Sequence, residues 1–237
     1  MTAGTAGKTG LYAEKFERNP LTRTQQEKVR KAVFAIVGLG GTGGFILENL
    51  LRMGAEKLVV FDHDRFELSN FNRQTLATEE FLDLPKVHAA VARAKAINKG
   101  IAIRAHGEFG EGSAGLLQGA DIVLDGTDNV KSKLIVSRMA RSLKIPYVFC
   151  SAQGSRGIVS VFTSHRFEKA FHLPDDDAEL ERYRVCQSVI CPAASLSGTL
   201  AASQAVSVLL GKPYAKAPDA VFFDLFRKGV FWRGRLG

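Results

Sequence analysis

Residues 33–44 read VFAIVGLGGTGG, and this stretch decides the expected fold. An apolar run suited to a buried strand leads directly into a glycine-rich turn. Gly38, Gly40 and Gly43 have the GxGxxG spacing of a dinucleotide-binding turn between a strand and a helix. Glycines at these positions let the backbone approach an anion closely, and the N–H groups that open the next helix point at that anion. We therefore expect a nucleotide to bind at this turn.

Apolar runs and helical segments alternate around this turn and beyond it. The expected strands are 33–37, 57–61, 101–105, 121–125 and 146–150, and the expected helices are 42–53, 86–98 and 130–142. Continuous apolar strands separated by helices predict a parallel sheet that is covered on both faces. The expected fold class is therefore α/β, with a Rossmann-like, doubly wound and mostly parallel sheet.

The C-terminal part of the chain has a different pattern. It contains an apolar run at 157–163, an acidic loop at 175–181 and a terminal segment at 220–235 that is typical of a hairpin. These features predict a C-terminal antiparallel extension of the sheet. The uncharged stretch 185–211 predicts a buried helix with small side chains, because its glutamines and serines are unsuited to a membrane span. Such a helix suits close packing, either within the subunit or at a dimer interface.

Composition limits the function classes. Lys plus Arg is 32 against 24 for Asp plus Glu, so the net charge is +8 and favours anionic partners such as a nucleotide, an acidic protein or RNA. Three cysteines are too few for a disulfide scaffold and indicate a reducing compartment, which we expect to be the cytoplasm. The first ten residues contain no apolar segment, so we expect neither a secretory signal nor a membrane partner.

Asp62 follows the second expected strand and lies 19 residues after Gly43. A carboxylate at this place accepts hydrogen bonds from ribose hydroxyls, whether the ribose belongs to NAD or to ATP. The glycine turn and Asp62 together therefore fit a dehydrogenase as well as an ATP-dependent enzyme.

The segment that follows Asp62 favours ATP. It reads DHDRFELSNFNRQTL over residues 62–76 and places Arg73 just beyond the ribose carboxylate. Lys86 begins a helix after Pro85, and Asp128 follows a strand, where a Mg²⁺ ion on phosphate oxygens needs a hard oxygen ligand. Fixed cations suit nucleotidyl transfer, which must neutralise charge on a triphosphate, whereas hydride transfer has no such need.

In their order along the chain, the motifs GLGGTGG, DHDRFELSNFNRQ, PKVHAA and DGTDN are similar to those of the E1-like activating enzymes of the MoeB, ThiF and HesA group. The resemblance covers residues 11–211. It implies an enzyme that binds ATP and Mg²⁺ and adenylates a carboxylate, usually the C-terminal glycine of a ubiquitin-like sulfur-carrier protein, with release of pyrophosphate.

The resemblance also implies roles for individual residues. Asp62 would hold the ribose, Arg73 and Lys86 the phosphates, and Asp128 the metal. The implied nucleotide-binding set is Gly38, Gly40, Gly41, Gly43, Asp62, Asn70, Arg73, Gln74, Lys86 and Asn129. The implied catalytic set is Arg73, Lys86, Asp128, Arg18 and Cys186.

The N-terminal arm, residues 1–31, is expected to be partly disordered over residues 1–10 and has too little apolar surface to fold alone. Its FERN segment is similar to the family segment whose arginine reaches the neighbouring subunit's site, so Arg18 is expected to act in trans within a homodimer. The arm would then pack on the partner subunit, and residues 32–237 would form a single adenylation domain.

The cysteines depart from the family pattern. The stretch VCQSVICP is shorter than the usual cysteine loop, so Cys186 or Cys191 matches the loop cysteine that some members use as a nucleophile. An inert buried cysteine is the alternative for both. Many members bind structural zinc through two CxxC pairs, which this chain lacks, so we expect no zinc.

Three other functions remain open on the residues alone. The same site in related proteins activates small-molecule, peptide or tRNA-borne carboxylates, and the positive charge mildly favours tRNA. A non-catalytic subunit of a split enzyme would have lost Arg73, Lys86 or Asp128, and all three are present. A dehydrogenase is the least favoured alternative.

Overall fold

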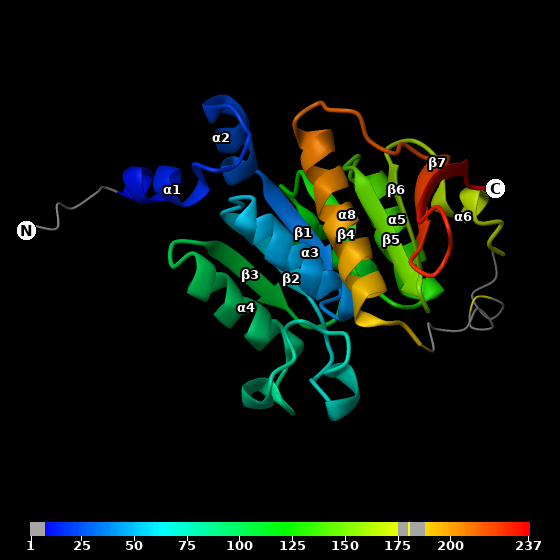
Figure 1. Ribbon diagram of the computed structural model, residues 1–237, viewed down its shortest axis with the longest axis horizontal. Coiled ribbons are helices and arrows are strands. Elements are labelled where there is room, and N and C mark those ends of the chain that lie inside the picture. Colours follow the sequence, from blue (N-terminus) through cyan, green and yellow to red (C-terminus); the bar gives the residue numbers. More distant parts are fainter. Residues whose placement is uncertain (1–7, 175–179, 181–187) are drawn as a thin grey trace, which may run out of the picture.

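The computed structural model describes residues 8–174, 180 and 188–237, which form a three-layered α/β unit (Figure 1). Its eight-stranded sheet has the order β3-β2-β1-β4-β5-β6-β7-β8. The strands are β1 (Val33–Val37), β2 (Lys57–Phe61), β3 (Ala102–His106), β4 (Ile122–Asp125), β5 (Tyr147–Gln153), β6 (Arg156–Phe162), β7 (Asp219–Asp224) and β8 (Phe231–Arg235). The first five strands pair in parallel and the last three pair antiparallel, so the predicted fold class and the antiparallel extension are confirmed.

Helices cover both faces of the sheet. They are α1 (Lys8–Phe16), α2 (Arg23–Lys31), α3 (Gly41–Arg52), α4 (Lys86–Ile97), α5 (Val130–Ser142), α6 (Phe167–Ala170) and α8 (Cys191–Leu209). Short 3₁₀ turns are η1 (Leu68–Asn70), η2 (Glu79–Phe81) and η3 (Glu111–Leu117). In Figure 1, α3, α4 and α8 lie in front of the sheet and α5 lies behind it.

The two faces of the sheet contribute to two separate hydrophobic cores. On β1, Phe34 and Ile36 belong to the core shared with α3, α4 and α8, whereas Ala35 and Val37 belong to the core shared with α5 and α6. This division follows from the period of two along a strand, which sends successive side chains to opposite faces. A strand buried on both sides must therefore be apolar at every position, as β1 is.

The uncharged helix is α8, and its small residues pack within the subunit. Gly198 lies so close to α3 that an added Cβ would be 2.4 Å from the carbonyl oxygen of Thr42. Ala201 and Ala202 are buried in the core, whereas Ser203 is exposed. The close packing that we predicted for this helix is thus against α3 and the sheet, and Ala201 and Ala202 are not available to a second subunit.

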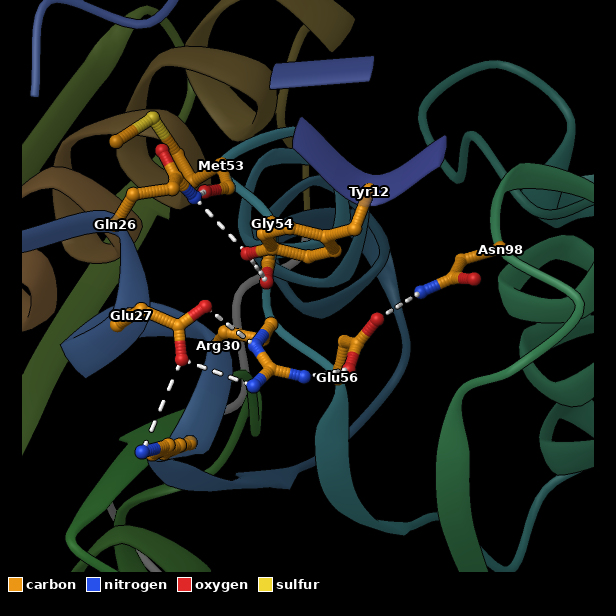
Figure 2. A network of polar contacts seen from close by, with 9 residues as sticks. Tyr12, Gln26, Glu27, Arg30, Met53, Gly54, Glu56 and Asn98 are labelled. Carbon is orange, nitrogen blue, oxygen red and sulfur yellow. Dashed lines mark hydrogen bonds and ion pairs between the residues drawn. The ribbon is translucent and has the colours of Figure 1, made fainter. Parts of the chain in front are cut away.

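The N-terminal arm lies on its own subunit, at the C-terminal end of α3. The Tyr12 hydroxyl donates to the carbonyl of Gly54 (2.7 Å), and Gln26 donates to the carbonyl of Met53 (2.8 Å; Figure 2). Val29 is fully buried in the core beside α3 and α8. The described residues of the arm thus pack on a surface of their own chain.

A charged network extends this contact. Arg30 binds Glu27 (2.8 Å) within α2 and reaches Glu56 (3.3 Å), whose other carboxylate oxygen accepts from Asn98 (3.2 Å; Figure 2). The network joins the arm to the turns that precede β2 and follow α4. Residues 8–10, which we expected to be disordered, belong to α1, and residues 1–7 lie outside the described part of the chain.

Candidate active site

A pocket of about 650 Å³ opens at the carboxyl ends of the parallel strands. Side chains and backbone from the glycine turn, the segment after β2, the β4–α5 loop and the N-terminal end of α8 line it. The expected site residues that line it are Gly38, Gly40, Gly41, Asp62, Arg73, Gln74, Lys86, Asp128 and Asn129. Segments far apart in sequence therefore meet at the edge where ligands of open α/β sheets bind.

The glycines of the turn have distinct structural roles. Gly38 has a φ of +87°, which favours glycine. A Cβ on Gly43 would lie 1.9 Å from the carbonyl oxygen of Gly38, so Gly43 permits the approach of α3 to the end of β1. Gly43 is absent from the lining of the pocket among the described residues.

Gly41 differs, because its own chain leaves room for a side chain. A Cβ there would meet Ala194 at 3.4 Å and Arg73 at 3.6 Å, which are ordinary contact distances. Gly41 lines the pocket, so the space beside it is open to a ligand. The structure thus separates a glycine needed for folding, Gly43, from a glycine whose missing side chain keeps the pocket open.

Asp62 joins the glycine turn to the end of β2. Its carboxylate accepts hydrogen bonds from the backbone N–H of Leu39 (2.7 Å) and of Asp64 (2.9 Å). Burial raises the pKa of Asp62 above its usual value, and the Lys86 ammonium and the two N–H donors oppose this rise. The carboxylate is held in place in the lining of the pocket, where a ligand hydroxyl can reach it.

Two cationic side chains face the same pocket. Lys86 is buried at the start of α4 and its ammonium group lies 2.8 Å from a carboxylate oxygen of Asp64. Arg73 donates to the carbonyl of Ser69 (2.8 Å) and to the side-chain oxygen of Asn72 (2.9 Å), which orients its guanidinium group. Both cations are therefore fixed before any anion arrives, as electrostatic preorganisation requires.

Gln74 and Asn70 come from one turn but have different roles. Gln74 lines the pocket, and its buried side-chain oxygen has no hydrogen-bond partner within the described part of the chain. Asn70 is absent from the described lining. Its side chain accepts from Glu67 N (3.2 Å) and its carbonyl accepts from Gln74 N (2.9 Å). Asn70 thus shapes the turn that presents Arg73 and Gln74.

The loop between β4 and α5 supplies an acidic group. Asp128 is exposed and lines the pocket, and Asn129 caps α5 by accepting from Ser132 N (2.8 Å). No group of three or more His, Cys, Asp or Glu residues suited to a metal occurs within residues 8–174, 180 and 188–237. A Mg²⁺ ion at Asp128 would therefore need oxygens of the nucleotide and of water to complete its coordination.

Arg18 lies away from this pocket. It is exposed on the chain between α1 and α2, and those helices contact Met53 and Gly54 at the C-terminal end of α3 (Figure 2). The pocket is at the N-terminal end of the same helix, which is 12 residues long. At 1.5 Å per residue α3 is roughly 18 Å long, so the arm that carries Arg18 lies at the opposite end of this helix from the glycine turn.

No cysteine is among the described residues that line the pocket, and the choice between Cys186 and Cys191 as a nucleophile stays a prediction. Cys186 lies outside the described residues, so its expected role stays a prediction. Cys191 begins α8 and is half-buried. Cys150 is fully buried, and burial raises the pKa of its thiol to about 12, so it is protonated at neutral pH.

Three parts of the lining were missed on the sequence alone. They are Gly107–Phe109 after β3, Ser151, Ala152 and Gly154 at the end of β5, and Ser188–Ile190 before α8. The first follows from the rule that ligands bind beyond strand ends, because β3 ends at His106. The other two depend on how the antiparallel extension and α8 fold back over the sheet, for which the sequence carries no local signal.

No helix within the described residues is long and apolar enough to span a membrane.

A parallel sheet with a glycine-rich turn, a strand-end carboxylate and fixed cations around one pocket defines a Rossmann-type nucleotide-binding enzyme of the E1-like class. The sequence matches the ThiF family over residues 12–233. The chain belongs to the ThiF family and is an E1-like adenylyltransferase.

Two curated relatives illustrate the similarity. The sulfur carrier protein ThiS adenylyltransferase of Escherichia coli (strain K12) is 30% identical over 203 residues, covering 84% of this chain and 81% of that protein. The molybdopterin-synthase adenylyltransferase of Haemophilus influenzae is 33% identical over 191 residues, covering 78% of this chain and 77% of that protein.

Solved structures confirm the fold. The crystal structure of PaaA superposes with a TM-score of 0.79 at 19% identity, covering 100% of this chain and 77% of that one. The crystal structure of E. coli MccB with ATP superposes with a TM-score of 0.74 at 17% identity, covering 90% of this chain and 66% of that one.

Proposed function

We propose that the protein uses ATP to adenylate the C-terminal glycine carboxylate of a ubiquitin-like sulfur-carrier protein, with release of pyrophosphate. The observation that carries this proposal is the meeting of Arg73, Lys86 and Asp128 with the glycine turn and Asp62 around one pocket. The names of the curated relatives favour a sulfur-carrier substrate over a small-molecule, peptide or tRNA-borne carboxylate.

The residues of the pocket fit ATP. Its volume of about 650 Å³ lies within the range of nucleotide-sized ligand sites. The unpartnered oxygen of Gln74 can accept a hydrogen bond from the ligand, which would remove the cost of an unsatisfied buried acceptor. The open space at Gly41 admits the triphosphate beside the N-terminal end of α3.

Each side chain has a role in this arrangement. Asp62 accepts hydrogen bonds from the ribose hydroxyls, and Arg73 and Lys86 bind the phosphates. Asp128 would hold Mg²⁺, which would offset the negative charge of the phosphate oxygens. Asn129 and Gln74 complete the wall of the nucleotide site.

The reaction needs little acid–base chemistry from the protein. The substrate carboxylate is already ionised at pH 7 and can attack the α-phosphorus directly. One carboxylate oxygen forms a bond to that phosphorus while the bond to the bridging oxygen of the β-phosphate breaks, and pyrophosphate leaves with the electron pair. Arg73 and Lys86 reduce the repulsion between the two anions and hold them in line, so catalysis is mainly positioning and charge neutralisation.

We infer further that the enzyme is a cytoplasmic homodimer. The distance of Arg18 from the pocket of its own chain supports a role in the site of a second subunit. The low cysteine content supports a reducing compartment. Packing of the N-terminal arm on the partner subunit, in addition to its contacts within the chain, belongs to this proposal.

ATP–pyrophosphate exchange tests the function. We expect exchange that depends on a carrier protein ending in Gly-Gly and that stops when its terminal carboxylate is amidated. Arg73→Ala should abolish most of this exchange. Exchange with a metabolite or with tRNA, but with no carrier, would overturn the choice of substrate. Full exchange by Arg73→Ala would overturn the assigned site.

A further inference from the structure

A buried ion pair lies beneath the pocket without lining it. Asp125, the last residue of β4, is fully buried, and the side chain of Lys133 on α5 is 7% exposed. The Lys133 ammonium group lies 3.4 Å from an Asp125 carboxylate oxygen. Burying two charges is costly, and apolar residues in their place are often as stable, so stability alone is a weak reason for such a pair.

Lys133 links the end of β4 to the neighbouring strand β5. Its ammonium group donates to the carbonyl oxygen of Thr127 (2.6 Å), just after β4, and to that of Cys150 (3.0 Å), within β5. These two hydrogen bonds add to the ion pair with Asp125, so the ammonium group has three oxygen partners. A single side chain thus fixes the place where the β4–α5 loop leaves the sheet.

Asp125 holds the same loop from the other side. Its carboxylate accepts from the backbone N–H (2.8 Å) and the hydroxyl (2.6 Å) of Thr127, and from the hydroxyl of Tyr147. Burial and the Asp125 carboxylate keep the pKa of Tyr147 well above its usual value, so this hydroxyl remains a donor. Thr127 is therefore held through its N–H, its hydroxyl and its carbonyl.

The residue that follows Thr127 is Asp128. On the N-terminal side of Thr127, Gly126 packs so tightly against the glycine turn that a Cβ would lie 2.4 Å from the carbonyl oxygen of Gly38. On the C-terminal side of Asp128, Asn129 caps α5. Asp128 itself is exposed to the pocket. The loop is thus fixed on both sides of the Asp128 carboxylate, which itself accepts from the side-chain amide of Asn129 (3.3 Å).

We propose that Lys133 is a positioning residue, which acts with Asp125 through Thr127 to fix Asp128 where it binds the metal–nucleotide complex. This inference rests on the proposed function, because it assigns Asp128 the metal. Groups that orient a metal ligand from behind typically change metal affinity by 10–100-fold when they are removed. The buried charges are then retained for the geometry of Asp128, whereas a purely structural pair would affect folding alone.

The test measures how much Mg²⁺ tightens ATP binding. The dissociation constant of ATP is measured by calorimetry in EDTA and in Mg²⁺, without carrier protein, and the first value is divided by the second. Lys133→Met should lower this ratio by about ten-fold, and Lys133→Arg, which keeps the charge and donors, should retain most of it. The control is Arg141→Met, which removes a different ion pair of α5, the one with Glu168, whose two residues do not line the pocket.

Tyr147→Phe covers the case in which Lys133→Met fails to fold. It removes one hydrogen-bond donor from Asp125, leaves the ion pair in place and should lower the ratio in the same direction. The inference is overturned if Lys133→Met folds and keeps the wild-type ratio. If Lys133→Met does not fold, a wild-type ratio in Tyr147→Phe overturns it. An equal fall of the ratio in Arg141→Met also overturns it. It is also overturned if Mg²⁺ does not tighten ATP binding by the wild-type protein.

The two proposals fail separately. A wild-type protein that binds ATP more tightly with Mg²⁺, but shows no carrier-dependent exchange, contradicts the proposed substrate and leaves the binding test of Lys133 intact. Normal exchange together with a full Mg²⁺ effect in Lys133→Met contradicts the positioning role alone.

Discussion

The ammonium group of Lys86 lies 2.8 Å from a carboxylate oxygen of Asp64, and the two side chains differ in burial, at 7% and 51% exposed. Lys86 is enclosed at the start of α4, whereas Asp64 can turn toward solvent. A polyanionic ligand can therefore replace Asp64 as the partner of a cation that is already in place. This relationship holds the lysine ammonium group in position at the pocket.

Loss of this cation should affect catalysis more than folding. We expect Lys86→Met to lower the turnover of carrier-dependent ATP–pyrophosphate exchange by about 10²- to 10³-fold, as for loss of one preorganised donor to a transition state. Lys95→Met, on the exposed side of the same helix, is the control and should retain wild-type exchange. Near wild-type turnover by Lys86→Met would show that the lysine does not contact the reacting phosphates.

Gly43→Ala should damage the fold. The new methyl group would lie 1.9 Å from the carbonyl oxygen of Gly38, and backbone must move to admit it. We expect a loss of about 3 kcal/mol or more in the free energy of unfolding, measured by urea denaturation. A variant with wild-type stability would mean that α3 can shift away from β1 at little cost.

Gly41→Ala should have the opposite profile. Its methyl group meets only ordinary contacts in the chain, so the free energy of unfolding should be unchanged or slightly higher, since alanine favours helix. The same methyl group would crowd the triphosphate, and we expect ATP to bind about ten-fold more weakly, as measured by calorimetry. Unchanged ATP affinity would place the phosphates elsewhere in the pocket.

Mixing of two inactive variants tests the role of Arg18. If Arg18 acts in the partner's site, a dimer of one Arg18→Ala subunit and one Lys86→Met subunit contains one complete site. Random exchange of subunits should then restore about a quarter of the wild-type activity. Co-purification with two different tags isolates the mixed dimer. An inactive mixed dimer would contradict action in trans.

Acid should weaken the contact between α5 and α6 through Glu168. Burial alone would raise the pKa of this carboxyl, but hydrogen bonds from its own backbone N–H and from Arg166 and Arg141 lower it from 4.5 to about 2. Since the folded pKa lies below the unfolded one, ionised Glu168 contributes stability that is fully present above about pH 5 and is lost as the pH falls toward 2.

Glu168→Gln measures this contribution. We expect the variant to be less stable than the wild type by about 2 kcal/mol at pH 6, allowing for the partial exposure of the two arginines. The difference should shrink as the pH falls from 5 to about 2. The readout is urea denaturation at several pH values, with Glu80→Gln, an exposed glutamate, as the control. A pH-independent difference would assign the effect to packing.

Local patterns in the sequence predict much of the architecture of the site. The apolar run 33–37 and the glycines after it determine a strand, a tight turn and a helix start, because turn chemistry and helix initiation depend on neighbouring residues. Asp62 and Asp128 were found by the rule that the ends of parallel strands meet at one edge. Each of these features is carried by a few neighbouring residues, so it can be predicted from the sequence.

The same patterns do not show which of the expected residues line the pocket. Asn70 and Gly43 match positions expected in the nucleotide site, yet in the structure one shapes a turn and the other admits α3 to the end of β1. Their roles depend on side-chain direction and on the approach of two backbones. Neither can be predicted from spacing along the chain.

The sequence by itself determined the α/β class, the parallel order of chemistry-bearing strand ends and the charges available to a nucleotide. Only the tertiary structure decided that Arg18 lies at the opposite end of α3 from its own pocket, and that Lys133 binds carbonyls of both β4 and β5. The physical reason is the distance along the sequence over which each interaction acts. Periodicity and turns act over a few residues, whereas these contacts exist only once strand register and helix packing bring distant residues together.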